Sequence, residues 1–535
     1  MDFQETVQDL IQLTNDAHTR YQKPVCYNAI FLQPFAFDLR IVQGADGSVQ
    51  EEPKAFLMAN TYTNAYLQIF PDSPINSLFG QEVTLLNDLE FTTEVTSWAD
   101  ARETRSNNRG VRFNTAIRSY LYRSAIQYNV RPLTDLKVTL VDGRSFVFPW
   151  LASYTGGFAN TSFCAAVATG ADTSSMLTMN TPHSKHHFPF VNRTHHPELL
   201  DPPTPLVSTV LEQSSTSDRT IIVPADTPYF VSCFTQHVTN STQVSDVLVM
   251  KISSFSPSGT DGIKGFFANA EKCLTSNYDL VVIDVMQNGG GIVCLGLRML
   301  ELLIEDYNKD HSLVQMNYDL PHSPLMDTYI KVVNSNEGYI NKATGEPYPD
   351  GAAYYYGRNV TMGGVQHQRT NYFSLDCSDF EKLPFGFKPK KFMTPDRLIF
   401  ITDGTCGSTC ACFTKIPQEH KKVTIVGAGG LWEEGMDISS FAGGFVSNPD
   451  TMSSIAEESG LSFPKFLTNQ RWQFDWAIWY SELFPTRPAQ FVENEPDFRE
   501  PFWGFPHPSV DVSVTTAMVS NLYDNVINAA VARFN

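Results

Sequence analysis

The chain has 535 residues, too many for one hydrophobic core, and its content of 42% hydrophobic and 12% aromatic residues predicts about two to four packed domains. Its 38 Lys and Arg residues against 57 Asp and Glu residues give a formal net charge of −19, which argues against nucleic acid as a partner, because phosphate neutralisation needs clustered cations. No apolar run approaches the roughly 20 residues that a membrane-spanning helix needs, and the first residues form neither the basic nor the apolar part of a signal peptide.

The first 150 residues are predicted to contain a helical segment followed by a small mixed module. The predicted elements are an amphipathic helix over 2–14, short strands over 26–90, a helix over 114–128 and two strands over 135–150. His18 follows the first helix, in Asp16-Ala-His18-Thr19. We therefore expect an N-terminal helical segment over residues 1–37 and a β/α module over residues 38–150.

Residues 151–245 are rich in Thr, Ser, Pro and His and are predicted to form a connecting segment with little structure of its own. Five of the twelve histidines lie in it: His183, His186, His187, His195 and His196. They could bind a transition metal, but without nearby acidic residues a polar linker is favoured, so no metal or cofactor is predicted. Nine scattered cysteines, an odd number, do not indicate a dense disulfide framework, and the cellular compartment stays open.

From residue 246 the pattern changes to strands that alternate with helices. The predicted elements are strands over 247–253, 280–286 and 423–427, helices over 262–274 and 292–305, and a strand–turn–helix unit over 398–413. This alternation predicts an α/β domain with a largely parallel sheet. We expect that domain over residues 246–450, interrupted by a polar, irregular insertion over 306–390 and completed by an extension over 451–535.

A serine stands in the strand–turn–helix unit, in Cys406-Gly-Ser408-Thr409-Cys410. An apolar, β-branched run ends in a Gly-containing turn, and Ser408 follows where a helix begins. The N–H groups at a helix N-terminus can hold the negative charge that develops on a substrate oxygen, which suits a nucleophilic hydroxyl. A plain helix N-cap is the alternative. Cys406 and Cys410 are interpreted as core residues or, in an exported protein, as a disulfide, and less readily as nucleophiles.

A second turn that could carry chemistry is Asn288-Gly289-Gly290-Gly291, between a buried strand and a helix. Glycines let a substrate approach the backbone closely, and their N–H groups can cradle an anion, either a phosphate or an oxyanion formed in acyl transfer. The spacing of a phosphate-binding loop is missing, and a simple tight turn remains the alternative. Asp284, at the end of the strand, is predicted to cap backbone groups of this turn rather than to act in catalysis.

Together these segments resemble the tail-specific (C-terminal processing) serine protease family, and within it the branch of the chlamydial protease-like activity factor and its fungal relatives. That branch carries its nucleophile in a Cys-x-Ser-Thr-Cys context and its histidine in an Asp-x-His-Thr context, which match Cys406–Cys410 and Asp16–Thr19. The resemblance implies an α/β fold with a crotonase-like (ClpP/crotonase-type) protease core and an inserted PDZ-like module at residues 38–150.

The resemblance also implies a role for each matched residue. Ser408 would be the nucleophile, and His18 would take its proton and return it to the leaving amine. The backbone N–H groups of Thr409 and of Gly289 or Gly290 would form the oxyanion hole.

The residue that orients the histidine is matched less well. Glu493, in a Glu-Asn pair like that of some relatives, is favoured as the acid, whereas an alternative alignment puts Gln490 at this position. Gln could fix the tautomer of the imidazole but could not stabilise its cation. Another branch of the family uses a Ser/Lys dyad, but Lys415 is expected to be a solvated helix residue, and Lys421 and Lys422 to lie in a loop before a strand.

The leading hypothesis is a serine-type endopeptidase that hydrolyses protein or peptide substrates through an acyl-enzyme intermediate, without a cofactor. One alternative, motivated by Gln490, is an inactive relative that acts as a binding or scaffold protein. Another is a crotonase-like acyl-CoA enzyme, which would need a basic patch for the CoA phosphates. Neither nucleic acid nor a membrane span is expected, and a homodimer is one assembly to test. The resemblance favours an extracellular location, although no signal peptide is visible.

Overall fold

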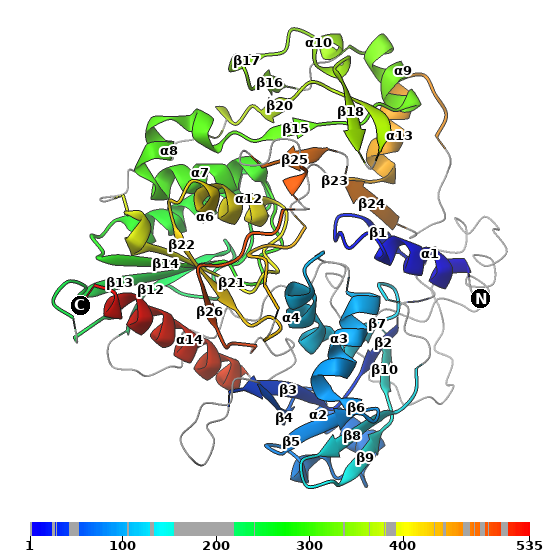
Figure 1. Cartoon of the computed structure of the whole chain (residues 1–535), viewed down its shortest axis with the longest axis vertical. Coiled ribbons are helices and arrows are strands. Elements are labelled where there is room, and N and C mark those ends of the chain that lie inside the picture. Colours follow the sequence, from blue (N-terminus) through cyan, green and yellow to red (C-terminus); the bar gives the residue numbers. More distant parts are fainter. Residues whose placement is uncertain are drawn as a thin grey trace.

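The protein is a mixed α/β structure, described here from a computed structural model, and its elements form three groups along one long axis (Figure 1). The structure describes residues 3–23, 27, 29–41, 53–103, 106–128, 133–154, 219–239, 241–334, 338–362, 364–378, 380, 392–432, 434–441, 446–463, 471–475, 477–481, 487–489, 492–503 and 512–534. Among these residues no helix has the length and apolar character needed to cross a membrane.

A seven-stranded sheet, here called the central sheet, forms the middle group. Its strands, in spatial order, are β11 (Arg219–Val223), β12 (Val231–His237), β13 (Asp246–Ile252), β14 (Leu280–Asp284), β21 (Leu398–Thr402), β22 (Thr424–Ala428) and β26 (Phe498–Glu500). From β13 to β26 neighbouring strands run parallel, as predicted for a largely parallel sheet. β11 and β12 run antiparallel within the segment predicted to be a linker, so that prediction was wrong for their residues; short β-branched runs outweigh the polar composition of the segment as a whole.

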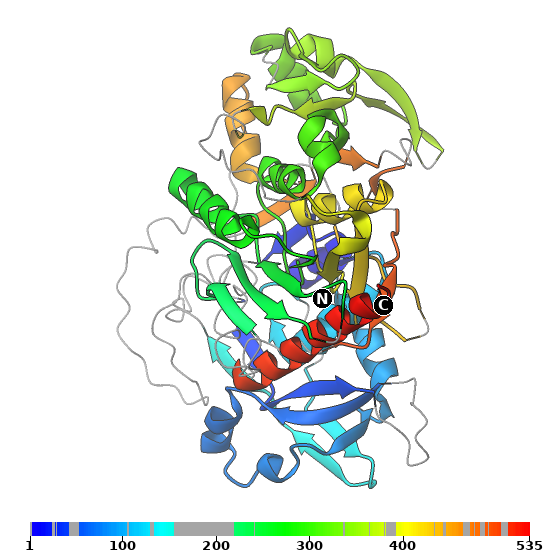
Figure 2. The ribbon, with the colours of Figure 1, turned by 90° about the vertical axis from the view of Figure 1, so that its left-hand side faces the viewer.

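Helices cover both faces of the central sheet. α6 (Gly259–Leu274), α7 (Val293–Leu303) and α12 (Thr409–Glu419) cover one face, and α14 (Val512–Ala532) crosses the other (Figures 1 and 2). Successive side chains of a strand point to opposite faces, so Val281 and Ile283 of β14 pack in the first layer and Val282 packs against α14. This layering places the carboxyl ends of the parallel strands, where ligands usually bind in such sheets, at one edge.

A second group, here called the small module, lies at one end of the long axis (Figures 1 and 2). Its strands are β3 (Phe35–Arg40), β4 (Lys54–Ala59), β5 (Glu82–Leu86), β6 (Leu89–Glu90), β8 (Leu136–Leu140) and β9 (Ser145–Phe148) in one sheet and β10 (Leu151–Tyr154), β2 (Ala29–Leu32) and β7 (Tyr122–Ser124) in another; its helices are α2 (Thr63–Ile69), α3 (Phe91–Arg102) and α4 (Arg109–Ser119). The two strands predicted over 135–150 are β8 and β9. The helix predicted over 114–128 starts earlier, because Asn108 caps α4 by accepting the Val111 N–H, and it ends before β7.

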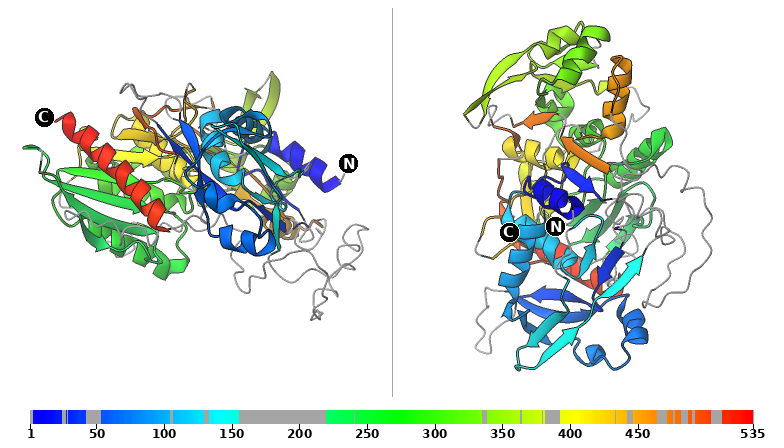
Figure 3. Two further views of the ribbon diagram at one scale, coloured as in Figure 1. Left: turned by 90° about the horizontal axis from the view of Figure 1, so that it is seen from below. Right: turned by 90° about the vertical axis from the view of Figure 1, so that its right-hand side faces the viewer.

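The N-terminal segment docks against a C-terminal part of the chain. α1 (Phe3–Gln12), the predicted amphipathic helix, leads into β1 (Arg20–Gln22), which pairs antiparallel with β24 (Arg471–Asp475) (Figures 1 and 3). On its other edge β24 pairs with β23 (Val446–Ser447), after which α13 (Pro449–Glu458) follows. This three-stranded sheet brings residues from the two ends of the chain together.

The insertion at the far end of the long axis is more regular than predicted. It contains helices α8 (Glu305–Lys309), α9 (Pro324–Val332) and α10 (Gly351–Tyr355), the hairpin β18 (Arg358–Met362) and β19 (Val365–Arg369), and the strands β15 (Asn317–Asp319), β16 (Tyr339–Asn341), β17 (Glu346–Pro347) and β20 (Phe373–Leu375), whose sheet is completed by β25 (Ile478–Tyr480). Its many aromatic residues pack together rather than lining loops: the rings of Tyr339 and Phe373 stack with centroids 4.0 Å apart.

The described residues contain three disulfides, two of which the sequence did not predict. They join Cys233 to Cys273, Cys294 to Cys377 and Cys406 to Cys410. Within the described part of the chain, the buried Cys412 is the remaining free thiol. The scattered spacing gave no sign of the first two pairs, because their partners meet only in the folded chain.

Candidate active site

Ser408 occupies a strained turn between β21 and α12. Its φ of 53° and ψ of −122° lie outside the regions that L-residues normally adopt, and it stands directly before the first residue of α12. Its N–H donates to the Phe441 carbonyl at 2.8 Å, which fixes the backbone, while the side chain is partly exposed. Such a turn at a helix N-terminus presents the hydroxyl toward an incoming substrate, as in hydrolases with a nucleophile elbow. Ser408 therefore stands at the start of a helix, as the sequence predicted, and its role as nucleophile stays a prediction.

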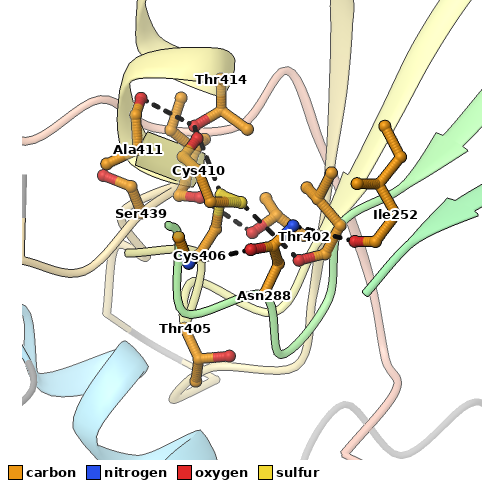
Figure 4. Close-up of a disulfide and its surroundings, with 12 residues drawn as sticks. Ile252, Asn288, Thr402, Thr405, Cys406, Cys410, Ala411, Thr414 and Ser439 are labelled. Atoms are coloured by element: carbon orange, nitrogen blue, oxygen red, sulfur yellow. Dashed lines mark hydrogen bonds between the residues drawn. A yellow bond between two sulfur atoms is a disulfide. The ribbon is translucent and has the colours of Figure 1, made fainter. Parts of the chain in front are cut away.

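The predicted glycine turn lies against this serine turn. The buried Asn288 donates from Nδ2 to the Ile252 carbonyl at 2.9 Å, and its own carbonyl accepts the Gly407 N–H at 3.0 Å (Figure 4). A Cβ on Gly290 would lie 2.7 Å from Ser408 Cβ and 2.9 Å from the Thr409 nitrogen, and its φ is +97°. Glycine is therefore required at this position both for its conformation and for the close approach of the two turns.

Two backbone N–H groups are free to form an oxyanion hole. The Gly290 N–H already donates to Asn288 Oδ1 at 2.9 Å, so the geometry argues against the Gly290 donor that the sequence left open. Within the described structure the N–H groups of Gly289 and Thr409 make no hydrogen bond, and Gly289 is exposed. These two donors belong to the two turns that meet at Gly290 and Thr409, as an oxyanion hole built from both turns would require.

His18 is buried just before β1 and lies between two carboxyl groups. Its backbone N–H donates to Asp16 Oδ1 at 2.9 Å, and the Thr19 hydroxyl donates to Asp16 Oδ2 at 3.0 Å. On the other side, His18 Nδ1 is 2.7 Å from Asp475 Oδ1, at the end of β24, although the two atoms are not aligned as in a normal hydrogen bond. Asp475 was missed by sequence reasoning, because only the β1–β24 pairing brings it to the histidine.

Phe441 connects the serine turn to the histidine. Its ring lies edge-on to the His18 ring, with centroids 4.7 Å apart, and fills the space that a Cβ on Gly407 would need, at 2.2 Å. Among the described residues no hydrogen bond joins Ser408 to His18. General-base catalysis would therefore require the imidazole and the hydroxyl to approach each other, as catalytic groups often do only when substrate is bound.

Burial perturbs all three ionisable groups of this cluster. Loss of solvent lowers the pKa of His18 to about 4, with the negative charge of Asp16 opposing the shift, so the imidazole is neutral near pH 7 and able to accept a proton. Burial raises the pKa of Asp16 to about 6, helped by the charge of Asp475, and raises the pKa of Asp475 to about 6 as well. Perturbed groups of this kind gather at functional sites.

The structure places Glu493 and Lys415 away from these groups. Glu493 is exposed, and no contact described in the structure joins it to His18. Lys415 is buried, not solvated as expected: Nζ donates to Asn494 Oδ1 at 3.0 Å and to the Val492 carbonyl and lies 3.4 Å from Asp437 Oδ2. The expectation was wrong because α12 is buried along the side that carries Lys415. Held by these partners, Lys415 is not free to act as a base.

The remaining sequence-based candidates fall into two groups. Asp284 accepts the Met286 N–H at 2.8 Å, before the glycine turn that it was predicted to cap, and is also held by Lys251 at 2.9 Å. Cys406 and Cys410 form the disulfide of Figure 4, which rules them out as nucleophiles in this state. Gln490 and the histidines of residues 183–196 lie outside the described residues.

Comparison with known proteins assigns the domain that carries both turns. Residues 246–432 match the model of peptidase family S41. Within these residues the chain is similar to peptidases of this family. This match includes the glycine turn and Ser408, and it supports a serine-type peptidase over the acyl-CoA enzyme and the scaffold protein.

The likeness in fold to one solved structure extends beyond this domain. Mature CPAF has 14% sequence identity and a TM-score of 0.50, with 99% of this chain and 88% of that chain covered. CPAF complexed with lactacystin has 13% identity and a TM-score of 0.48 over 99% and 89% of the two chains. The photosystem II D1 C-terminal processing protease has 8% identity and a TM-score of 0.27 over 93% and 81%. A comparison with curated proteins finds no match.

Proposed function

We propose that the protein is a serine endopeptidase in which Ser408 is the nucleophile, His18 the general base and Asp475 the acid behind the histidine. The observation that carries the proposal is the placement of Ser408, at a strained helix start beside two unengaged N–H groups, inside the S41 peptidase domain. Asp475 replaces Glu493 in this assignment, because Asp475 contacts His18 and Glu493 is exposed.

The proposed reaction follows from these positions. The scissile carbonyl would lie over Ser408 with its oxygen toward the N–H groups of Gly289 and Thr409. With Asp475 at Nδ1, the other ring nitrogen of His18 is left to take the Ser408 proton, and Asp475 stabilises the imidazolium that results. Collapse of the tetrahedral intermediate passes that proton to the leaving amine and leaves an acyl-enzyme, which a water activated by His18 then hydrolyses.

Substrate entry is expected to displace Phe441. The ring of Phe441 contacts His18 and packs over Gly407, so it occupies space between the base and the nucleophile. Moving the ring would let the imidazole approach Ser408 while the peptide carbonyl enters the oxyanion hole.

The wider architecture supports three further parts of the proposal. We assign the central sheet with its helices to a crotonase-like core and the small module to a PDZ-like insert, which the strand-and-helix content and chain position favour. The three disulfides favour an oxidising compartment, as for an exported protein. The net charge of −19 argues against nucleic acid, and a homodimer stays a prediction that sedimentation analysis would test.

A fluorophosphonate probe tests the proposal directly, because it reacts only with an activated serine. The full-length protein should be labelled, whereas Ser408→Ala should not, and His18→Ala should be labelled far more slowly. A Ser454→Ala variant, which removes an exposed hydroxyl on α13 away from both turns, serves as the control. Absence of labelling of a folded wild-type protein would overturn the assignment.

A further inference from the structure

Helix α4 of the small module has a second face directed at the catalytic domain. One face belongs to the core of the small module, through Phe113, Ala116 and Ile117. The other lies beside the loops that follow β21 and β22, and Figure 1 shows α4 between the central sheet and the rest of the small module. The serine turn begins in the first of these loops.

Asn114 is the residue of α4 that reaches both loops. Its Nδ2 donates to the Asp403 carbonyl at 2.8 Å and to the Ala428 carbonyl at 2.9 Å, while its Oδ1 accepts the Gly430 N–H at 2.7 Å. One side chain therefore satisfies three backbone groups on two loops, which holds the loops at a fixed separation.

Asp403 passes this constraint to the two catalytic turns. Its Oδ1 accepts the Thr405 N–H at 3.1 Å, at the start of the serine turn, and the Gln287 N–H at 3.2 Å, directly before the glycine turn. The Thr405 hydroxyl donates to the same oxygen at 2.6 Å. The backbone of Asp403, held by Asn114, and its side chain thus link α4 to both halves of the oxyanion hole.

The packing next to Asn114 leaves little room for this link to slide. A Cβ on Gly404, which has a φ of +75°, would lie 2.5 Å from Val111 Cγ2 of α4. Helix and turn are therefore in close contact one helical turn from Asn114, and a closely packed contact transmits a displacement.

We propose that Asn114 is a positioning residue for the peptidase reaction: it sets the Asp403 backbone and through it the spacing between Ser408 and the two oxyanion N–H groups. The small module would then be part of the machinery that aligns the active site, and not only an appended module. The inference rests on the proposed function. It assigns to Asn114 an effect on the rate of the chemical step and not on substrate binding.

The test compares Asn114→Ala with Asn108→Ala in the full-length protein. Asn108 is a matched control, because it lies on the same helix and donates across the same interface to the Gly435 carbonyl at 3.3 Å, but contacts neither catalytic turn. Saturation kinetics of fluorophosphonate labelling give kinact and KI, and thermal unfolding gives Tm. A misplacement of about 1 Å can cost a rate of order 10²-fold, so Asn114→Ala should lower kinact by roughly 10- to 100-fold with KI unchanged.

The control is expected to lower Tm without changing kinact, because it loses a cap and an interface bond only. Asn114→Asp, which turns an acceptor toward two carbonyls, should be slower than Asn114→Ala, and Asn114→Ser, which keeps one donor, should be intermediate. If Asn114→Ala does not fold, the Ser variant supplies the comparison with Asn108→Ala. Equal kinact values for the wild type and the folded Asn114 variants would overturn the inference, whereas a folded wild type that is not labelled would instead overturn the proposed function.

Discussion

Replacing Asp475 with Asn tests which carboxyl group acts behind the catalytic histidine. Asp475 Oδ1 lies 2.7 Å from His18 Nδ1, and the histidine becomes a cation in the transition state. For a carboxylate about 4 Å from the centre of the imidazolium charge, at an effective dielectric constant of about 20, the interaction is about 4 kcal/mol. That corresponds to a factor of about 10³ in rate. We therefore expect Asp475→Asn to lower kcat/KM by about 10³-fold.

Glu493→Gln is the matched control, since it makes the same change in an exposed residue, and it should stay within about twofold of the wild type. Hydrolysis of fluorescently labelled casein measures kcat/KM, and thermal unfolding checks the fold. Burial raises the pKa of Asp475 to about 6, so its ionised form is disfavoured in the folded protein, and a neutral amide should not lower Tm. A large loss in Glu493→Gln with little loss in Asp475→Asn would refute the reasoning and restore the acid predicted from the sequence.

Three further predictions concern pH, the glycine turn and the buried lysine. Activity should fall as the pH drops below about 6, because burial raises the pKa values of Asp16 and Asp475 to about 6. Protonation of these carboxylates removes the charge that stabilises the imidazolium. His18, with a pKa of about 4, is still neutral in this range. Labelling rates between pH 4 and 8 measure this limb, which should move to lower pH in Asp475→Asn; an unmoved limb would contradict the assignment. Gly290→Ala should lower kcat by about 10²-fold or more, because the new Cβ would lie 2.5 Å from the Gly407 carbonyl oxygen. Gly143→Ala is the control: Gly143 has a similar φ of +85° but open space around it, so this change should cost about 1 kcal/mol of stability and leave activity unchanged. Lys415→Met should lower stability by about 3–5 kcal/mol in chemical denaturation, because it leaves the buried Asp437 without its cation, yet the folded fraction should keep its labelling rate; loss of labelling with intact stability would favour a Ser/Lys dyad instead.

The parts of the candidate site that could be predicted are those whose turns follow directly from the neighbouring residues in the sequence. Ser408 and the glycine turn each follow an apolar strand. Short β-branched runs that end in glycines predict a strand and a turn from local sequence alone. His18 was proposed only because its Asp-x-His-Thr context resembles that of the tail-specific protease branch. Even here the sequence could not choose between Gly289 and Gly290, because the choice depends on the side chain of Asn288, which takes the Gly290 N–H.

The rest depends on pairings that no local pattern encodes. Asp475 ends a strand of aromatic and polar residues, and nothing in that strand indicates that it will pair with β1 from the other end of the chain. Lys415 looks solvated in a short window, since lysine is rarely buried, and only its bonds to Asp437, the Val492 carbonyl and the Asn494 side chain explain its burial. The insertion appeared irregular because its strands are two to five residues long, and one partner strand comes from residues 478–480.

The division of the site between chain segments has a consequence for its assembly. The S41 match, residues 246–432, includes the proposed nucleophile and oxyanion donors, but His18 and Asp475 both lie outside it. His18 reaches the site only when β1 pairs with β24, and the fully buried Lys23, bonded to Glu5 at 2.9 Å, holds α1 to the end of β1. A peptidase domain without this docking would keep an oxyanion hole, which alone accounts for about 10³- to 10⁴-fold over water in serine proteases, but would lack the base. The stability of the N-terminal docking, and not only the geometry around Ser408, is therefore expected to set how much of the protein is active.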